Sequence, residues 1–404
     1  MNVHIARQPI FDKNMNVYAY ELLYRSEKGI SAPSTNGDHK TNEVVFNTLV
    51  TMGLDTMLSG SKAFINFTKE TINNKLPEMF SNEILVIELL EDIIPDENFI
   101  NQCQTLKSNG YLLALDDFDS TYIYDDVIEM VDIIKVDFMI TTQDERCVLF
   151  EKYNNNDVRF LAEKVESKEE FDEAIGMGYD YFQGFFFSKP ILVSGNDFKT
   201  FNSAYASILT ELNKLEPSYD ILDEIIKKDF SITFKLLKLV NSAAFYSRNR
   251  ITSIKHALVM IGFKELKKWF SLMMVRDAGE DQPKELIRMS LIRARLAESL
   301  LKSTAYKKRA SEGFLLGLFS LIDVILDRRM EEIIDDLPLE PDIIAALYDE
   351  ESTFLGILKM IRFYEHGEWQ LVRQQLEVYD LDFLAISTCY LEAIDWVNII
   401  EEMN

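Results

Sequence analysis

Short apolar runs rich in Val, Ile and Phe alternate with charged, helix-compatible stretches from Met1 to about Ser194. The runs recur roughly every 20 to 30 residues, the repeat expected of a barrel built from βα units. This pattern predicts an α/β domain. A compressed (β/α) barrel is the first interpretation and a doubly wound open sheet is the alternative. The runs lie at residues 64–67, 85–89, 112–117, 133–136, 160–166 and 181–187.

The spacing of apolar residues becomes helical beyond Pro190, after a polar stretch at 194–204 that contains turn-forming residues. Phe234, Leu237 and Val240 follow the spacing of a buried helical stripe, and strand-like runs are scarce. We therefore expect an all-α second domain. The predicted domains are residues 1–200 and 205–404, and the predicted fold class is α/β plus all-α.

Length and charge exclude some classes of function. The 404 residues exceed what one hydrophobic core usually serves. A formal charge of -25 supplies none of the phosphate neutralisation on which binding of duplex nucleic acid relies. The three cysteines have no CxxC spacing, so no disulfide framework or thiolate zinc site is indicated. Without a signal peptide or an apolar run of about 18 residues, we expect a cytoplasmic protein with no membrane span.

Polar residues interrupt or end the apolar runs of the first half, where an unpaired carboxylate is costly to bury. In a barrel the carboxyl ends of parallel strands converge on one mouth, so these side chains could meet there. Crowded carboxylates need cations between them, and an oxygen-only ligand set favours Mg²⁺ or Mn²⁺ over zinc. The alternative is that they are solvated strand ends or internal ion pairs with Lys135. The residues are Asn66, Glu88, Asp116, Asp117, Lys135, Glu163 and Gln183.

The sequence from about Gln8 to Pro190 resembles the EAL family of cyclic-di-GMP phosphodiesterases. The resemblance rests on an ordered set of motifs, in which Leu22 replaces the family's alanine while Glu21 is kept. The motifs are QPI at 8–10, YELLYR at 20–25, NF at 66–67, the Glu88 strand, DDF at 116–118, Lys135, AEKVE at 162–166 and QGFFFSKP at 183–190.

The resemblance implies an EAL barrel that hydrolyses one phosphodiester bond of cyclic-di-GMP to give linear pGpG with two divalent ions, Mg²⁺ or Mn²⁺. It assigns the first ion to Glu21, Asn66, Glu88 and Asp116, and the second to Asp117 with help from Glu163. The implied catalytic group is Lys135, Glu163 and Gln183: Lys135 holds or activates the attacking water and Gln183 orients water or metal ligands. The implied substrate-binding residues are Gln8, Arg25 and Pro190.

One loop departs from the family pattern. After DDF the family continues with a glycine-containing loop, whereas this chain has Asp119, Ser120 and Thr121. Three possibilities stay open at this point: an active phosphodiesterase, a receptor that binds cyclic-di-GMP without cutting it, and a scaffold that has lost nucleotide binding.

The second half resembles the HDOD family, relatives of the HD phosphohydrolases, over roughly residues 208–404. The motifs that carry the resemblance lie at 228–245, 253–263 and 313–326. The third motif has Ser320 and Asp323 where HD enzymes carry metal ligands, and none of the chain's four histidines is followed by Asp. We therefore expect a regulatory or interaction module without hydrolytic activity.

Two features of this half have structural interpretations. We expect His256 to be a hydrogen-bonded core or interface histidine, and the basic cluster Lys264, Lys267 and Lys268 to be a solvated helix face, with partner docking as the alternative. Protein partners are expected through the EAL or HDOD surfaces, including a homodimer.

Overall fold

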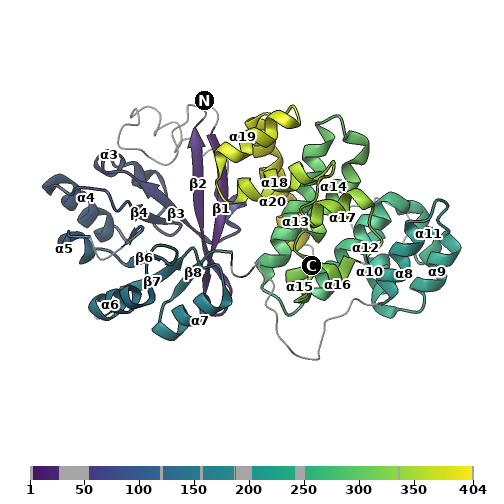
Figure 1. The fold of residues 1–404 in the computed structure, drawn as a ribbon, viewed down its shortest axis with the longest axis horizontal. Helices are drawn as coiled ribbons and strands as arrows, with labels where there is room; N and C mark the ends of the chain where they lie inside the picture. Colours follow the sequence, from purple (N-terminus) through teal and green to yellow (C-terminus); the bar gives the residue numbers. More distant parts are fainter. Residues whose placement is uncertain are drawn as a thin grey trace. The chain divides into compact units, whose positions relative to one another are not determined.

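The computed structural model describes residues 3–26, 54–118, 122–154, 158–185, 187, 203–241, 251–334 and 337–402. The chain forms two compact units (Figure 1). Unit 1 comprises residues 1–189 and 360–404, and unit 2 comprises residues 190–359.

Unit 1 contains a closed barrel of eight strands in sequential order, which confirms the predicted barrel and rules out the open sheet. All neighbouring strands are parallel except at β1, which runs antiparallel to both β2 and β8. The first element is therefore a β-hairpin rather than a βα unit. The strands are β1 (Val3–Asp12), β2 (Val17–Ser26), β3 (Lys62–Phe67), β4 (Leu85–Leu89), β5 (Leu112–Leu115), β6 (Ile133–Asp137), β7 (Arg159–Glu163) and β8 (Tyr181–Gln183).

The β1–β2 hairpin is longer than the barrel wall. Both strands have 10 residues, whereas β4 has 5. Ile10–Asp12 pair with β8 and Ala19–Glu21 pair with β3, so the segment from Val3 to Arg7 pairs only with the end of β2. The hairpin therefore extends past the barrel on the side where the parallel strands end.

One buried apolar residue from each strand forms a layer across the barrel. Such layers make a barrel of this size a packed core and not a pore. The layer consists of Ile10, Ala19, Phe64, Val86, Ala114, Ile133, Leu161 and Tyr181.

Short helices follow the strands of unit 1, and α3, α4, α6 and α7 begin at side-chain caps. Thr142 with Glu145, and Ser167 with Glu170, form capping boxes that satisfy free N–H groups at the starts of α6 and α7. These helices are α2 (Leu54–Leu58), α3 (Lys69–Asn73), α4 (Glu97–Ser108), α5 (Asp125–Ile128), α6 (Gln143–Tyr153) and α7 (Lys168–Met177).

The last part of the chain returns to unit 1. Residues 360–404, which hold the end of α18 (Leu355–Glu365), α19 (Trp369–Val378) and α20 (Phe383–Glu402), group with the barrel. Tyr364 donates a hydrogen bond to the carbonyl of Ile5 at 2.9 Å, and His4 Nδ1 lies 2.9 Å from Ser387 Oγ. The predicted helical domain ran to residue 404, whereas unit 2 ends at Lys359. The helical spacing of apolar residues predicts a helix, but it does not indicate which hydrophobic core that helix packs against.

Helix α20 is also more apolar than the sequence analysis recognised. Residues Phe383–Glu401 are long and apolar enough to cross a membrane by length and composition alone, with a mean hydropathy of 1.4. The helix contacts the barrel through polar side chains: besides the Ser387 contact, Asn398 donates to the carbonyl of Thr56 at 2.9 Å. These contacts are typical of a helix packed against a folded domain.

Unit 2 is helical throughout its described part, as predicted. Its longest helix, α13, is buried along most of its length. The helices are α8 (Ser203–Leu212), α9 (Tyr219–Ile226), α10 (Phe230–Val240), α11 (Ile254–Ile261), α12 (Phe263–Ala278), α13 (Lys284–Lys302), α14 (Ala310–Phe319), α15 (Ile322–Leu326), α16 (Met330–Ile334) and α17 (Pro341–Leu347), before α18 begins.

Three expectations about side chains in unit 2 differ from the structure in whole or in part. Helix α10 buries Ile232, Leu236 and Val240 rather than Phe234, whose side chain is 60% exposed. His256 is exposed and is therefore no core residue. Lys268 is largely buried and pairs with Glu298, so the basic cluster is not simply a solvated face.

Candidate active site

A ring of polar residues covers the apolar layer of the barrel. On each of the seven parallel strands the polar residue lies two positions after the apolar one, and on the antiparallel β1 it lies two positions before it. Because side chains alternate along a strand, both sets point into the barrel. The ring lies where the parallel strands end. It consists of Gln8, Glu21, Asn66, Glu88, Asp116, Lys135, Glu163 and Gln183.

Lys135 occupies the centre of this ring and is fully buried. Its Nζ lies 2.6 Å from Asp116 Oδ1, 2.8 Å from Glu163 Oε1 and 4.0 Å from Glu21 Oε1, and it also forms an ion pair with Glu88. Ion pairs with Lys135, which the sequence analysis kept as an alternative, are therefore present. One ammonium group faces four carboxylates. Its single charge cannot neutralise all four, so an additional cation would be stabilised at this site.

Burial and mutual repulsion set the protonation of these groups. Burial holds the pKa of Glu88 and of Glu163 well above the usual range, and the charge of Lys135 opposes that shift. Burial alone would lower the pKa of Lys135, but the carboxylates around it, Asp116 foremost, hold it well above its usual value. The ring is therefore a charged ammonium group surrounded by carboxyl groups, two of which resist ionisation.

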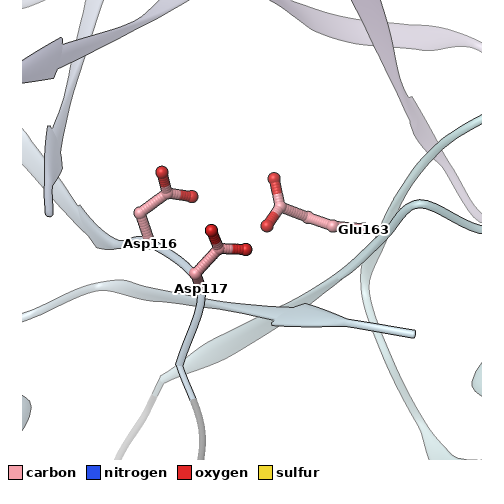
Figure 2. Close-up of side chains that lie close together, drawn as sticks. All are labelled: Asp116, Asp117 and Glu163. Atoms are coloured by element: carbon pink, nitrogen blue, oxygen red, sulfur yellow. The ribbon is translucent and has the colours of Figure 1, made fainter. Parts of the chain in front are cut away.

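Asp116, Asp117 and Glu163 form an acidic cluster at the edge of the ring (Figure 2). One carboxylate oxygen from each lies within 4.8 Å of the others. Burial, followed by the charge of Asp116, raises the pKa of Asp117. Asp117 has φ of 40°, in the left-handed region that few residues other than glycine, asparagine and aspartate adopt readily. This backbone turn lets two consecutive aspartates serve one site.

Several buried oxygens of the ring have no hydrogen-bond partner among the residues that the structure describes. They include Asn66 Oδ1, Glu88 Oε2, Glu163 Oε2 and Gln183 Oε1. Such oxygens are costly to bury unless something pairs with them. Oxygen ligands of this kind suit Mg²⁺, Mn²⁺ or Ca²⁺, so the residues present fit divalent ions.

The two glutamines of the ring link β8 to the hairpin. Gln183 Nε2 donates to Glu21 Oε2 at 2.5 Å and to Gln8 Oε1 at 3.1 Å. Gly184, the next residue, lies so close to β7 that an added Cβ would meet the carbonyl oxygen of Val165 at 2.1 Å. The QG pair therefore needs glycine for close packing as well as glutamine for the polar ring.

Some predicted residues lie outside this description. The side chain of Arg25 and the whole of Pro190 fall outside the described residues, as do Asp119, Ser120 and Thr121. The structure therefore says nothing of the predicted roles of Arg25 and Pro190 or of the altered loop.

Two sets of residues near the site escaped the sequence analysis. Asp137 ends β6, where its carboxylate pairs with Lys164, and Lys164 Nζ also lies 3.5 Å from Asp117 Oδ1. Asp137 could have been recognised from the sequence as a site residue, because it is a polar residue at the end of an apolar run. The second set is the connection between α18 and α19, which lines a pocket of about 490 Å³ together with residues 22–24 and Asn66. No local motif marks that connection.

Comparisons with known proteins agree on the domains. Residues 57–190 match the EAL domain model and residues 199–337 match the HDOD domain model. The chain is 37% identical to the uncharacterized protein YuxH of Bacillus subtilis over 98% of each chain. It is 30% identical to the cyclic di-GMP phosphodiesterase CdgJ of Vibrio cholerae, over 99% of this chain and 93% of that one.

The similarity to one solved structure is distant. Klebsiella pneumoniae BlrP1, solved as a calcium/cy-diGMP complex, is 22% identical with a TM-score of 0.40. That match covers 47% of this chain and 56% of BlrP1. The full-length relatives, together with the two domain matches, show that this chain belongs to the family of proteins in which an EAL domain is followed by an HDOD domain.

Proposed function

We propose that unit 1 hydrolyses cyclic-di-GMP to linear pGpG in a metal-dependent reaction, and that unit 2 is a regulatory or interaction module. The observation that carries the proposal is the polar ring, in which four carboxylates surround one lysine and several buried oxygens have no hydrogen-bond partner. The relationship to CdgJ, which is named a cyclic di-GMP phosphodiesterase, supports the choice of substrate.

The residues fall into three roles in this proposal. Glu21, Asn66, Glu88 and Asp116 hold one divalent ion, and Asp117 with Glu163 helps to hold a second. When bound, Mg²⁺ or Mn²⁺ ions would lower the pKa of a water molecule and neutralise charge on the phosphoryl oxygens. The third role, gripping the dinucleotide, belongs to Gln8, Arg25 and Pro190.

Lys135 and Gln183 position the attacking water in the proposed reaction. The Lys135 ammonium group is held by Asp116 and Glu163 at 2.6 and 2.8 Å and also pairs with Glu88, so its three protons face carboxylates. A divalent ion that binds one of these carboxylates would free a proton of Lys135 for a water oxygen. Gln183 is fixed by its hydrogen bonds to Glu21 and Gln8, which leaves its own oxygen as an acceptor. Buried groups in fixed positions of this kind act without reorganising during the reaction.

The second candidate function is a receptor that binds cyclic-di-GMP without cutting it. Two observations favour it: Lys135 already pairs with the carboxylates, and the family's glycine-containing loop is replaced at Asp119–Thr121. A cytoplasmic location and a protein partner or homodimer are further proposals that accompany either function.

Incubation of the purified full chain with cyclic-di-GMP separates the candidates. We expect pGpG to accumulate with Mn²⁺ or Mg²⁺ and not with excess EDTA, as measured by chromatography of the nucleotides. Calorimetric binding in Ca²⁺ without any pGpG in Mn²⁺ or Mg²⁺ would identify a receptor. If the chain neither binds nor cleaves the dinucleotide, the proposal fails.

A further inference from the structure

The pocket beside the polar ring has one wall from the barrel and one from the end of the chain. Leu23 and Asn66 lie on the barrel wall, and His366, Glu368, Trp369 and Leu371 lie on the wall formed by the α18–α19 connection and the start of α19. Figure 1 shows α19 beside the β1–β2 hairpin. Both walls belong to unit 1.

The pocket opens next to the proposed reaction site. Asn66 belongs to the polar ring and also lines the pocket, so the ring and the pocket adjoin at this residue. Gln8, another member of the ring, donates a hydrogen bond to the carbonyl of Glu365 at 3.3 Å. A group attached to a phosphodiester at the ring therefore reaches the pocket directly.

The end-of-chain wall is held in place by specific contacts. The His366 ring packs against the Phe185 ring, two residues after β8, with centroids 3.8 Å apart and the ring planes tilted. Trp369 is 7% exposed and packs edge-on against Tyr364. Gly367 has φ of 70°, and an added Cβ there would lie 3.0 Å from Leu23. The wall is thus a packed part of unit 1.

The chemistry of the pocket suits the donor-rich edge of guanine. Its volume of about 490 Å³ is that of a small-molecule site, and Leu23, Trp369 and Leu371 offer apolar faces. Glu368 is exposed, and its carboxylate has no hydrogen bond or ion pair within the described residues. His366 Nδ1 lies 2.5 Å from the Arg362 carbonyl, so Nδ1 carries the proton and Nε2 is left as an acceptor.

We propose that the α18–α19 connection completes the substrate site, and that the pocket holds one guanine base of the cyclic dinucleotide with Glu368 accepting from its N1–H and N2–H groups. Adenine lacks this pair of donors on the same edge, so Glu368 determines specificity for guanine over adenine. This inference rests on the proposed function, because the phosphodiester must lie at the polar ring for the base to enter the pocket.

Binding of cyclic dinucleotides to the full chain in Ca²⁺, measured by calorimetry, tests the proposal. We expect Glu368→Gln to weaken cyclic-di-GMP binding by about tenfold or more, as expected for the loss of hydrogen bonds to a charged group. The preference for cyclic-di-GMP over cyclic-di-AMP should fall with it. Leu371→Trp should also weaken binding, because the larger side chain fills the pocket.

Two substitutions on the same helix serve as matched controls. Glu377 and Val378 are exposed on α19 and do not line the pocket, so Glu377→Gln and Val378→Trp should bind like the unmodified chain. If Glu368→Gln and Leu371→Trp also bind like the unmodified chain, the inference is wrong and the proposed function stands. If the unmodified chain neither binds nor cleaves cyclic-di-GMP, the proposed function fails and takes the inference with it.

Discussion

Asn66 and Glu88 lie directly opposite each other on the neighbouring parallel strands β3 and β4, and each has a buried side-chain oxygen without a hydrogen-bond partner. Such oxygens are costly to bury without a partner, and a divalent ion would supply one.

Glu88→Gln should lower the rate of cyclic-di-GMP hydrolysis by about 100-fold or more, because it removes a charged ligand while keeping its shape. Burial already raises the pKa of Glu88, so the neutral side chain should not lower the melting temperature in EDTA. Steady-state kinetics and thermal melting check both statements. The exposed Glu83, changed to Gln, is the control. Normal turnover by Glu88→Gln would remove Glu88 from the metal site.

Lys135→Met should strongly destabilise the metal-free protein. It leaves buried carboxylates without their cation, which costs about 3 to 5 kcal/mol when one member of a buried pair is removed. Urea unfolding in EDTA measures the loss, and added Mn²⁺ should recover part of it by supplying positive charge. Lys69→Met, at a solvent-exposed pair with Asp96, should destabilise the protein far less, because water and salt screen that pair. Equal effects at the two positions would contradict this electrostatic account.

Ser387→Ala should destabilise unit 1 by about 1 to 3 kcal/mol, because the buried Ser387 hydroxyl contacts both His4 and Tyr364. Thr388 is exposed on the same helix, so Thr388→Ala should change the free energy of unfolding little. Chemical unfolding of both variants provides the comparison. No difference between them would show that α20 contributes little through this contact.

Cys103 should resist thiol reagents in the folded protein. Its side chain is fully buried, and burial raises its pKa to about 12, so almost no thiolate is present at pH 8. Cys147 is exposed and should react rapidly. Labelling followed by mass spectrometry of the peptides distinguishes the two, and Cys147→Ser should remove the rapid phase. Rapid labelling of Cys103 before unfolding would contradict its burial.

The barrel site could be predicted because its residues are specified by the pattern of apolar and polar positions within each strand. Each ring residue, such as Glu88 or Glu163, lies two positions from an apolar residue on the same strand, so the pattern of one strand already places both layers. Closing the barrel then brings the strand ends together. The antiparallel direction of β1 was not predicted, since the apolar pattern of a strand is the same in either direction.

The pocket and the destination of the last helices could not be predicted, because they depend on contacts between distant residues. Leu23 and Gly367 lie at opposite ends of the chain, and nothing near either of them indicates the other. Phe234 shows a second limit. The helical spacing of apolar residues predicted that Phe234 is buried. This was wrong because α10 has exposed phenylalanines at 230 and 234 in addition to its buried stripe.

The division of unit 1 between the two ends of the chain has a consequence for synthesis. Residues 190–359 leave the ribosome between its two parts. At about 5 to 20 residues per second, this takes roughly 10 to 30 s. During that interval the newly made barrel has neither α19 nor α20 against its hairpin, so the second wall of the pocket is missing. The nascent protein can therefore acquire its acidic ring well before the pocket beside that ring is complete.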